Sequence, residues 1–167
     1  MKSAELLEDG LGRVREVVHD VVRGLDIDQL TFRPAPSANS VCWLIWHLTR
    51  VQDDHVADVA GTGQAWTSDG WSARFALPLA DSETGYGHGA DQVGAVRASA
   101  DLLTGYHDAV HARSVAFVRT LTDSGLDRIV DERWNPPVTL GVRLISVIDD
   151  DAQHAGQAAY LRGLILT

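Results

Sequence analysis

Apolar residues recur every three or four positions in four separate segments of the chain. The stripes run over residues 7–25, 41–56, 93–121 and 140–164. This spacing places the apolar side chains of each segment along one face of an α-helix. No segment shows a sustained period of two, the pattern that a half-buried strand requires. The sequence therefore predicts an all-α fold, a four-helix bundle of the antiparallel type.

Capping residues and helix breakers indicate where these helices begin and end. Ser40 and Thr139 are favourable N-cap residues ahead of the second and fourth stripes, and the third helix is expected to start at about Asp91. Two prolines within residues 32–37 predict a linker after the first helix. The four helices are expected to end near Gly24–Asp26, Gly61–Gly63, Ser124–Gly125 and Arg162–Gly163.

Two connections between the helices show no helical period. Residues 62–90 contain glycines, a proline and four aromatic residues, which predicts a long aromatic loop between the second and third helices. Long loops inside a compact domain usually serve function. Residues 131–137 predict a second irregular connection, with a few extended residues.

Length and charge limit the classes of partner. A chain of 167 residues is expected to form one domain, residues 1–167, with a core that needs no disulfide or structural metal. The 23 Asp and Glu outnumber the 14 Lys and Arg, and the net charge of −9 argues against nucleic acid and membrane surfaces as partners. A single cysteine, Cys42, and the lack of a secretory signal predict a cytoplasmic protein.

Three polar residues interrupt the apolar stripes and are candidate metal ligands. His47 lies three residues after Leu44 and four before Val51, so its imidazole is expected to face the bundle interior. Asp150 and His154 are four residues apart on the fourth helix and share one face. A carboxylate and two imidazoles from facing helices match a three-ligand divalent-metal site with an open coordination position, as in catalytic sites.

The same residues allow other interpretations. A single histidine on an apolar face is often a core residue with a hydrogen-bond partner, and an Asp–His pair one turn apart is often a surface contact. Asp151 lies three residues before His154, so it is the alternative carboxylate ligand, whereas Asp149 falls on the flank of the helix.

Other reactive residues are expected to be structural. His107 and His111 are one helical turn apart but lack the adjacent glutamate of the zincin signature, so we expect a buried, hydrogen-bonded His107 and an exposed His111. His19 and His55 are expected at the surface or on helix flanks. Cys42 could be a nucleophile, but the sequence shows no histidine paired with it, so it is expected to be a small buried hydrophobe.

Several runs of sequence resemble a known family. They are SVCWLIWHLTRVQDDH on the second helix, IDDDAQHAGQAAYLRG on the fourth, and ETGYGH ahead of the helix that contains LLTGYHDAVHARS. Together they resemble the DinB-like superfamily and, more narrowly, the actinobacterial DinB-like proteins that include mycothiol-dependent S-transferases. The resemblance extends from the first helix to Gly163.

The resemblance implies a four-helix bundle that binds a divalent metal, most often zinc or nickel. In this family the ligands are a His on the second helix and, on the fourth, a His or carboxylate followed four residues later by a His. By position these are His47, Asp150 and His154, the three residues selected from the stripes. Many relatives have His where this chain has Asp150, and an oxygen ligand weakens the preference for zinc.

The resemblance further implies an enzyme, a metal-dependent thiol S-transferase. A low-molecular-weight thiol such as mycothiol would be the co-substrate, and its metal-bound thiolate would attack an electrophilic small molecule. A non-catalytic metal-binding stress-response bundle and a metal-dependent hydrolase would use the same ligands. Proteins of this family often dimerise, so a homodimer is one implied state. Candidate contacts for the small molecules are Trp43, Trp46, Trp71, Arg74, His88 and Arg97.

Overall fold

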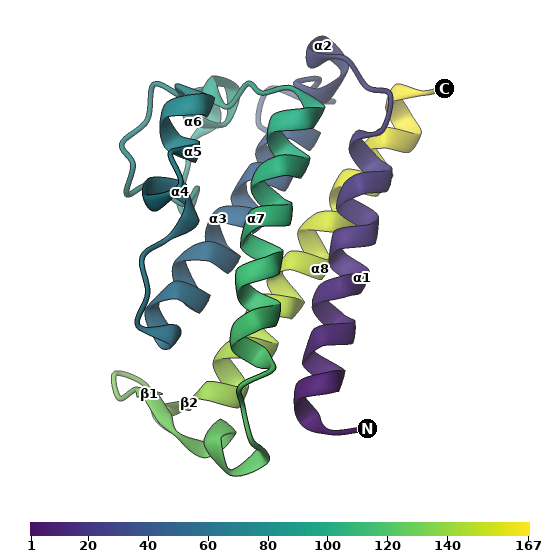
Figure 1. The fold of residues 1–167 in the computed structure, drawn as a ribbon. Helices are drawn as coiled ribbons and strands as arrows, with labels where there is room; N and C mark the ends of the chain where they lie inside the picture. Colours follow the sequence, from purple (N-terminus) through teal and green to yellow (C-terminus); the bar gives the residue numbers. More distant parts are fainter.

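Four long helices run along the length of the molecule (Figure 1). A computed structural model describes residues 1–167. The long helices are α1 (Ser3–Val22), α3 (Val41–Ala60), α7 (Ala100–Val118) and α8 (Leu140–Ile165). Each long helix packs mainly against two others, in the order α1, α7, α3, α8 around the bundle. The predicted all-α four-helix bundle is therefore confirmed.

Neighbouring helices include both antiparallel and parallel pairs. Helices α3 and α8 run in opposite directions, as do α1 and α7, whereas α3 runs parallel to α7 and α1 parallel to α8 (Figure 1). The parallel pair of α3 and α7 requires residues 61–99 to return the chain to the end of the bundle where α3 began. This long connection consequently runs alongside α3, where it can cover residues of that helix.

The predicted helix caps are present. The Ser40 side chain accepts a hydrogen bond from the backbone N–H of Trp43, and Thr139 accepts one from Val142. Each cap satisfies one of the backbone donors that a helix start leaves without a partner. Gly61 ends α3 in the left-handed conformation that glycine adopts without strain. These caps fix the starts of the two helices that carry the candidate ligands.

The third predicted helix is not continuous. The chain forms α6 (Ala90–Ala95), leaves helical geometry at Val96, and starts α7 with Ser99 as the N-cap. The Ser99 side chain accepts a hydrogen bond from the backbone N–H of Leu102, which favours a new helix start over continuation. The prediction of one unbroken helix from Asp91 was wrong. The apolar spacing continues through residues 96–99, where the backbone is not helical.

The end of that helix also differs from the prediction. Helix α7 ends at Val118, and a 3₁₀ helix, η1 (Asp123–Asp127), follows. Two short antiparallel strands, β1 (Ile129–Asp131) and β2 (Val138–Thr139), then form a hairpin before α8. The extended residues therefore flank the expected irregular connection, residues 131–137, and only Asp131 lies within it. None of the helices is long and apolar enough to span a bilayer.

The long connection between α3 and α7 is folded against the bundle. It contains α4 (Ala65–Ser68) and α5 (Trp71–Phe75) in addition to α6, and α2 (Ile27–Leu30) lies in the linker after α1. Trp66 is buried against Trp46 and Tyr106, which joins the connection to both α3 and α7. The predicted aromatic loop is therefore largely a packed segment with short helices.

Two buried residues of α3 hold this connection in place. The Asp53 carboxylate accepts hydrogen bonds from the backbone N–H groups of Ala65 and Trp66. The Arg50 guanidinium is fully buried and donates to the backbone carbonyls of Asp81 and Glu83. Because buried charges are stable only when paired or hydrogen-bonded, these contacts hold residues 81–83 close to α3.

Candidate metal centre

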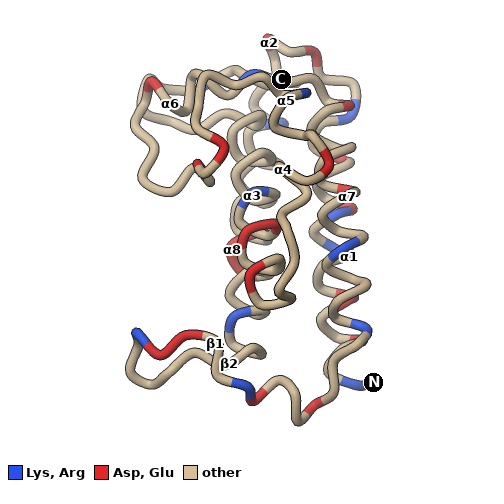
Figure 2. The backbone as a smooth tube through the Cα atoms, turned by 60° about the vertical axis from the view of Figure 1, so that its left-hand side comes forward, with Lys and Arg blue, Asp and Glu red and all other residues tan.

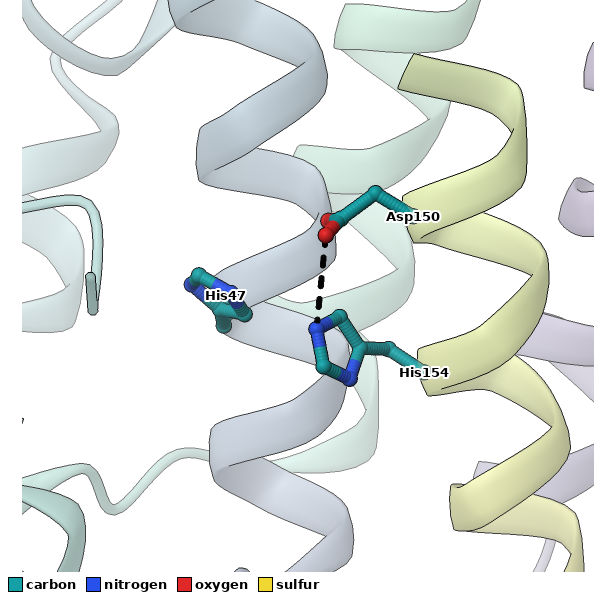
Figure 3. Close-up of side chains that lie close together, drawn as sticks. All are labelled: His47, Asp150 and His154. Atoms are coloured by element: carbon teal, nitrogen blue, oxygen red, sulfur yellow. Dashed lines mark ion pairs between the residues drawn. The ribbon is translucent and has the colours of Figure 1, made fainter. Parts of the chain in front are cut away.

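His47, Asp150 and His154 lie together between α3 and α8 (Figure 3). Asp150 and His154 project from neighbouring turns of α8 towards α3, which carries His47. One potential ligand atom from each residue lies within 4.8 Å of the other two. This is the only group of three or more His, Cys, Asp or Glu side chains with such spacing in the structure. The pairing of α3 with α8 thus brings together residues that are about a hundred positions apart in sequence.

His47 is held in one orientation and one tautomer. The residue is 6% exposed, and its Nδ1 lies 2.5 Å from the backbone carbonyl oxygen of Thr84. Since a carbonyl oxygen only accepts, Nδ1 must carry the proton, which leaves a lone pair on Nε2. Burial lowers the pKa of His47 and favours the neutral ring that a metal requires. A second hydrogen bond of this kind is typical of metal-binding histidines.

His154 is oriented by a contact within its own helix. Its Nδ1 lies 3.1 Å from Oε1 of Gln157, which fits donation from the ring to the amide oxygen. Its Nε2 then faces the Oδ1 atom of Asp150 at 3.6 Å. The indole of Trp43 stacks on the His47 ring and meets the His154 ring edge-on. Both imidazoles are therefore fixed by packing as well as by hydrogen bonds.

The carboxylates of Asp150 and Asp151 have different surroundings. Asp150 belongs to the cluster, and its Oδ2 atom is buried and has no hydrogen-bond partner. A divalent cation would satisfy that oxygen, so this donor set of two imidazoles and one carboxylate fits a metal ion. Asp151 instead faces the core and is fully buried, and burial raises its pKa well above the usual value. The geometry groups Asp150, and not Asp151, with the histidines.

Residues of the ETGYGH motif close over His47. Gly85 is buried with φ of +98°, and a Cβ atom at this position would lie 2.5 Å from Nδ1 of His47 and 3.2 Å from the Trp43 ring. His88 accepts a hydrogen bond from the indole N–H of Trp43 at 3.2 Å and contacts Glu83 through its other nitrogen. The motif therefore shapes the surroundings of His47, although none of its own side chains reaches the cluster.

A cavity of about 570 Å³ opens beside the cluster. His47 and Asp150 form one part of its wall, and Arg143 and His55 form another. The rest of the wall comes from α3, α8, residues 84–86 and the β1–β2 hairpin. A small molecule can thus approach the cluster from this side. A second cavity, of about 580 Å³, lies between α3 and α7 and contains none of the three candidate ligands.

The six candidate substrate contacts lie outside the cavity wall. Trp43 stacks on His47, and His88 packs against Trp43 and Trp46. Trp46 is also buried against Trp66. The wall of the cavity beside the cluster includes none of Trp43, Trp46, Trp71, Arg74, His88 and Arg97. Trp43 therefore contacts the site as a support for both histidines.

The other three candidates lie further away. Trp71 packs against Tyr106, and the Arg74 guanidinium covers the Trp71 ring. Arg97 is exposed and pairs with Asp28 at the surface.

Sequence reasoning found His47 and Asp150 but missed the other residues that line the cavity. Thr84 contributes a backbone carbonyl, which any residue type could supply, so its side chain gave no signal. Arg143 was detectable, because it lies seven residues before Asp150 on the same face of α8. His55 was expected at the surface or on a helix flank, and it lines the cavity next to Arg143.

The remaining histidines and Cys42 mostly follow the predictions. His107 is fully buried and its Nδ1 lies 3.2 Å from the Thr49 hydroxyl, and Cys42 is fully buried. Burial raises the pKa of the Cys42 thiol to about 12. His111 is half-buried instead of exposed, because it lies against α1 in a hollow formed with residues 8–16.

Comparisons with known proteins agree with this architecture. A family model described as mycothiol-S-transferase matches residues 6–166. The fold is similar to the crystal structure of a conserved protein from Enterococcus faecalis, with a TM-score of 0.93 and 32% sequence identity. That alignment covers 99% of this chain and 98% of the other. No curated protein matches the sequence.

Proposed function

The chain belongs to the mycothiol-S-transferase family of DinB-like proteins, and we propose that it transfers a low-molecular-weight thiol to an electrophilic small molecule. In this proposal His47, Asp150 and His154 hold one divalent ion, zinc or nickel, and the thiol is mycothiol or a close analogue. The family match supports the reaction class, and the cluster between α3 and α8 supports the metal.

The observation that carries the proposal is the arrangement of free ligand atoms. Each imidazole uses Nδ1 for a hydrogen bond outside the cluster, so Nε2 of each is free for coordination. Asp150 adds a buried oxygen that has no other partner. Three protein ligands leave at least one coordination position for a substrate atom, as in catalytic metal sites.

The chemistry divides between the ion and the protein. When bound, a divalent ion lowers the pKa of a coordinated thiol, so that the thiolate is available at neutral pH. The protein holds His47 through Thr84, and Trp43 and Gly85 exclude solvent from one side of its ring. The cavity on the other side gives the electrophile access to the cluster. The sulfur forms a bond to the electrophilic carbon while the bond from that carbon to its leaving group, such as a halide, breaks. The leaving group departs with the bonding electrons, and the thiol proton passes to solvent.

Metal analysis with a matched pair of variants tests the proposal. Asp150→Asn and Asp149→Asn remove the same charge from adjacent residues, but Asp149 is exposed and outside the cluster. We expect about one equivalent of metal in the wild type and in Asp149→Asn, and loss of the metal in Asp150→Asn. Mycothiol-dependent consumption of a fluorogenic haloalkyl bimane should likewise be retained in the wild type and Asp149→Asn and lost in Asp150→Asn.

Other outcomes would contradict parts of the proposal. Bound metal without any thiol-dependent reaction across several electrophiles would favour the non-catalytic metal-binding bundle. Consumption of a substrate at the same rate without thiol would indicate hydrolysis. If Asp150→Asn kept the full amount of metal, the proposal that Asp150 is a ligand would be wrong.

A further inference from the structure

The cavity beside the cluster has a guanidinium at some distance from the candidate metal ligands. Arg143 lies on α8 seven residues before Asp150, which corresponds to two helical turns and about 10 Å along the helix axis. Its side chain is only 14% exposed, and it forms part of the cavity wall. A ligand that reached from the cluster to Arg143 would therefore be elongated.

The charge of Arg143 is only partly neutralised by its neighbours. Its Nη2 donates to Asp131 at 3.2 Å, but Arg133 also binds the same carboxylate, at 2.8 and 2.9 Å. Two guanidinium groups thus share the Asp131 carboxylate, so Arg143 has no carboxylate partner of its own among its hydrogen-bond contacts. The β1–β2 hairpin, which carries Asp131 and Arg133, projects from the bundle beside the start of α8 with acidic and basic residues close together (Figure 2).

The remaining contact of Arg143 is with a neutral acceptor. Its Nη1 donates to Nδ1 of His55 at 3.0 Å. Burial and the neighbouring Arg143 guanidinium both lower the pKa of His55, so the ring is uncharged at neutral pH. A hydrogen bond to an ionised acceptor is stronger than one to a neutral acceptor. A carboxylate that entered the cavity would therefore be a better partner for Nη1 than His55.

Between these two polar regions the wall is mainly apolar. Four valines, from α3, α8 and β2, contribute to it, and two aromatic residues from different segments are exposed at its edge. Tyr86 is 93% exposed and Trp134 is 66% exposed, which leaves both rings available to a ligand. The four valines are Val51, Val138, Val142 and Val147.

We propose that the electrophile bound in this cavity is an elongated carboxylic acid with an apolar or aromatic body. Its carboxylate binds Arg143, its body packs on the valines, and its reactive carbon lies at the cluster. Asp54 and Asp150 also line the cavity, but Asp54 accepts a hydrogen bond from the Gln64 amide and Asp150 belongs to the cluster. This inference rests on the proposed thiol transfer and adds the class of its second substrate.

A pair of electrophiles that differ in one charge tests the proposal. The acid is a biphenyl with a bromomethyl group at one end and a carboxylate at the other, and the comparison compound is its methyl ester. Mycothiol and the zinc-loaded protein convert either compound to a thioether: a C–S bond forms, the C–Br bond breaks, bromide leaves with the bonding electrons, and the thiol proton goes to the buffer. The measurement is kcat/KM for each compound, corrected for the uncatalysed rate.

Two arginine variants provide the matched comparison. Arg143→Met and Arg133→Met each remove one guanidinium from Asp131, but only Arg143 lines the cavity. In the wild type we expect the acid to be preferred over the ester by about tenfold to a hundredfold. The preference should disappear in Arg143→Met and persist in Arg133→Met. Arg143→Lys keeps the positive charge and should retain part of the preference for the acid. It serves as the test variant if Arg143→Met fails to fold.

Binding of an unreactive acid separates this proposal from the proposed function. Calorimetric titration of the zinc-loaded protein with biphenyl carboxylate, which has no leaving group, requires no thiol chemistry. Tighter binding to the wild type than to Arg143→Met would support the carboxylate site even if no thiol transfer were found. Equal kcat/KM for acid and ester in the wild type, or equal losses in Arg133→Met and Arg143→Met, would overturn it.

Discussion

Gly85 is the residue whose lack of a side chain most directly sets the surroundings of His47. A Cβ atom there would lie 2.5 Å from the Nδ1 atom that donates to Thr84, so Gly85→Ala must displace the imidazole or the loop. Loss of an orienting hydrogen bond to a metal-binding histidine typically weakens metal affinity about tenfold to a hundredfold. We expect a loss of that size, measured by competition with a chelator of known affinity.

Gly87 provides the control for this substitution. Its φ is also positive, at +74°, but a Cβ atom there would meet nothing within 4 Å. Gly87→Ala therefore introduces a similar backbone strain, of about 1 kcal/mol, without the contact with His47. Both variants should lose thermal stability, and only Gly85→Ala should lose metal affinity. Equal metal affinities in the two variants would show that the close approach of Gly85 does not position His47.

Cys42 is a second residue whose surroundings determine its chemistry. Burial raises the pKa of its thiol to about 12, and its Sγ faces the carbonyl oxygen of Ala98. Since the thiolate is the reactive form, the folded protein should not react with iodoacetamide at pH 8. Intact-mass analysis should show no adduct on the folded protein and one adduct per chain in urea. Rapid labelling of the folded protein would mean that the α3 start opens readily and exposes Cys42.

At this scale, the sequence predicts side chains on helices better than it predicts their backbone partners. The proximity of His47, Asp150 and His154 follows from helical spacing and from the facing of two helices, whereas their role as ligands remains a proposal. The Thr84 carbonyl that orients His47 was not predictable, because a backbone group has no residue-type signature. The contact depends on the fold of residues 81–85, which Arg50 and Gly85 determine.

At the scale of elements, the interruption between α6 and α7 can be tested by one substitution. The sign of its effect on the free energy of unfolding shows whether the helix is interrupted or continuous. Ser99 is the N-cap of α7, so Ser99→Ala should cost about 1 kcal/mol in the free energy of unfolding. If the helix were continuous, the same change would stabilise it, because alanine has the higher helix propensity. Urea denaturation of the wild type and the variant measures the difference.

Thr104 is the control for the Ser99 substitution. It lies inside α7, and its hydroxyl donates to the Ala100 carbonyl within the helix. Thr104→Ala removes a side-chain hydroxyl without removing a cap, so its stability should stay within about 0.5 kcal/mol of the wild type. A stabilising effect of Ser99→Ala would show that the backbone stays helical through residues 96–99.

The short elements escaped prediction for a common reason. A long amphipathic helix shows several turns of period, whereas α4 and α5 span only four and five residues. Their stability comes from tertiary contacts, such as the Asp53 carboxylate on the first backbone N–H groups of α4 and the packing of Trp66 on Trp46. Propensity and period cannot indicate such contacts before the fold is known. The caps at Ser40 and Thr139 were predictable because they are local.

At the scale of the whole molecule, the order of the helices explains why the site lies at one side of the bundle. Helices α3 and α8 are neighbours and run in opposite directions, so the middle of one faces the middle of the other. The return of the chain from α3 to α7 places Thr84 and Gly85 against His47. The hairpin before α8 supplies the far end of the cavity. The helices thus carry the three candidate ligands, and the two long connections supply the rest of the site.

His107, which is buried in the bundle, should make the folded protein less stable as the pH falls. Burial lowers the pKa of His107 to about 3, against 6.5 for an ordinary histidine, which is the value in the unfolded chain. Between these values the unfolded chain binds a proton that the folded chain does not. The stabilising contribution is therefore complete above pH 6.5 and is lost as the pH falls towards 3. One such group contributes a slope of about 1.4 kcal/mol per pH unit.

Asp151 has the opposite effect on the pH dependence of stability. The contribution of His107 is therefore measured as the difference in free energy of unfolding between the wild type and His107→Gln. Its raised pKa means that the folded protein holds a proton more strongly than the unfolded chain, which adds stability as the pH falls. Asp151 is present in both the wild type and His107→Gln, and the glutamine can still contact Thr49. From pH 6 to 4, the free energy of unfolding of the wild type, taken relative to that of His107→Gln, should fall by about 1.4 kcal/mol per pH unit. Parallel pH profiles would show that His107 gains access to protons without unfolding of the bundle.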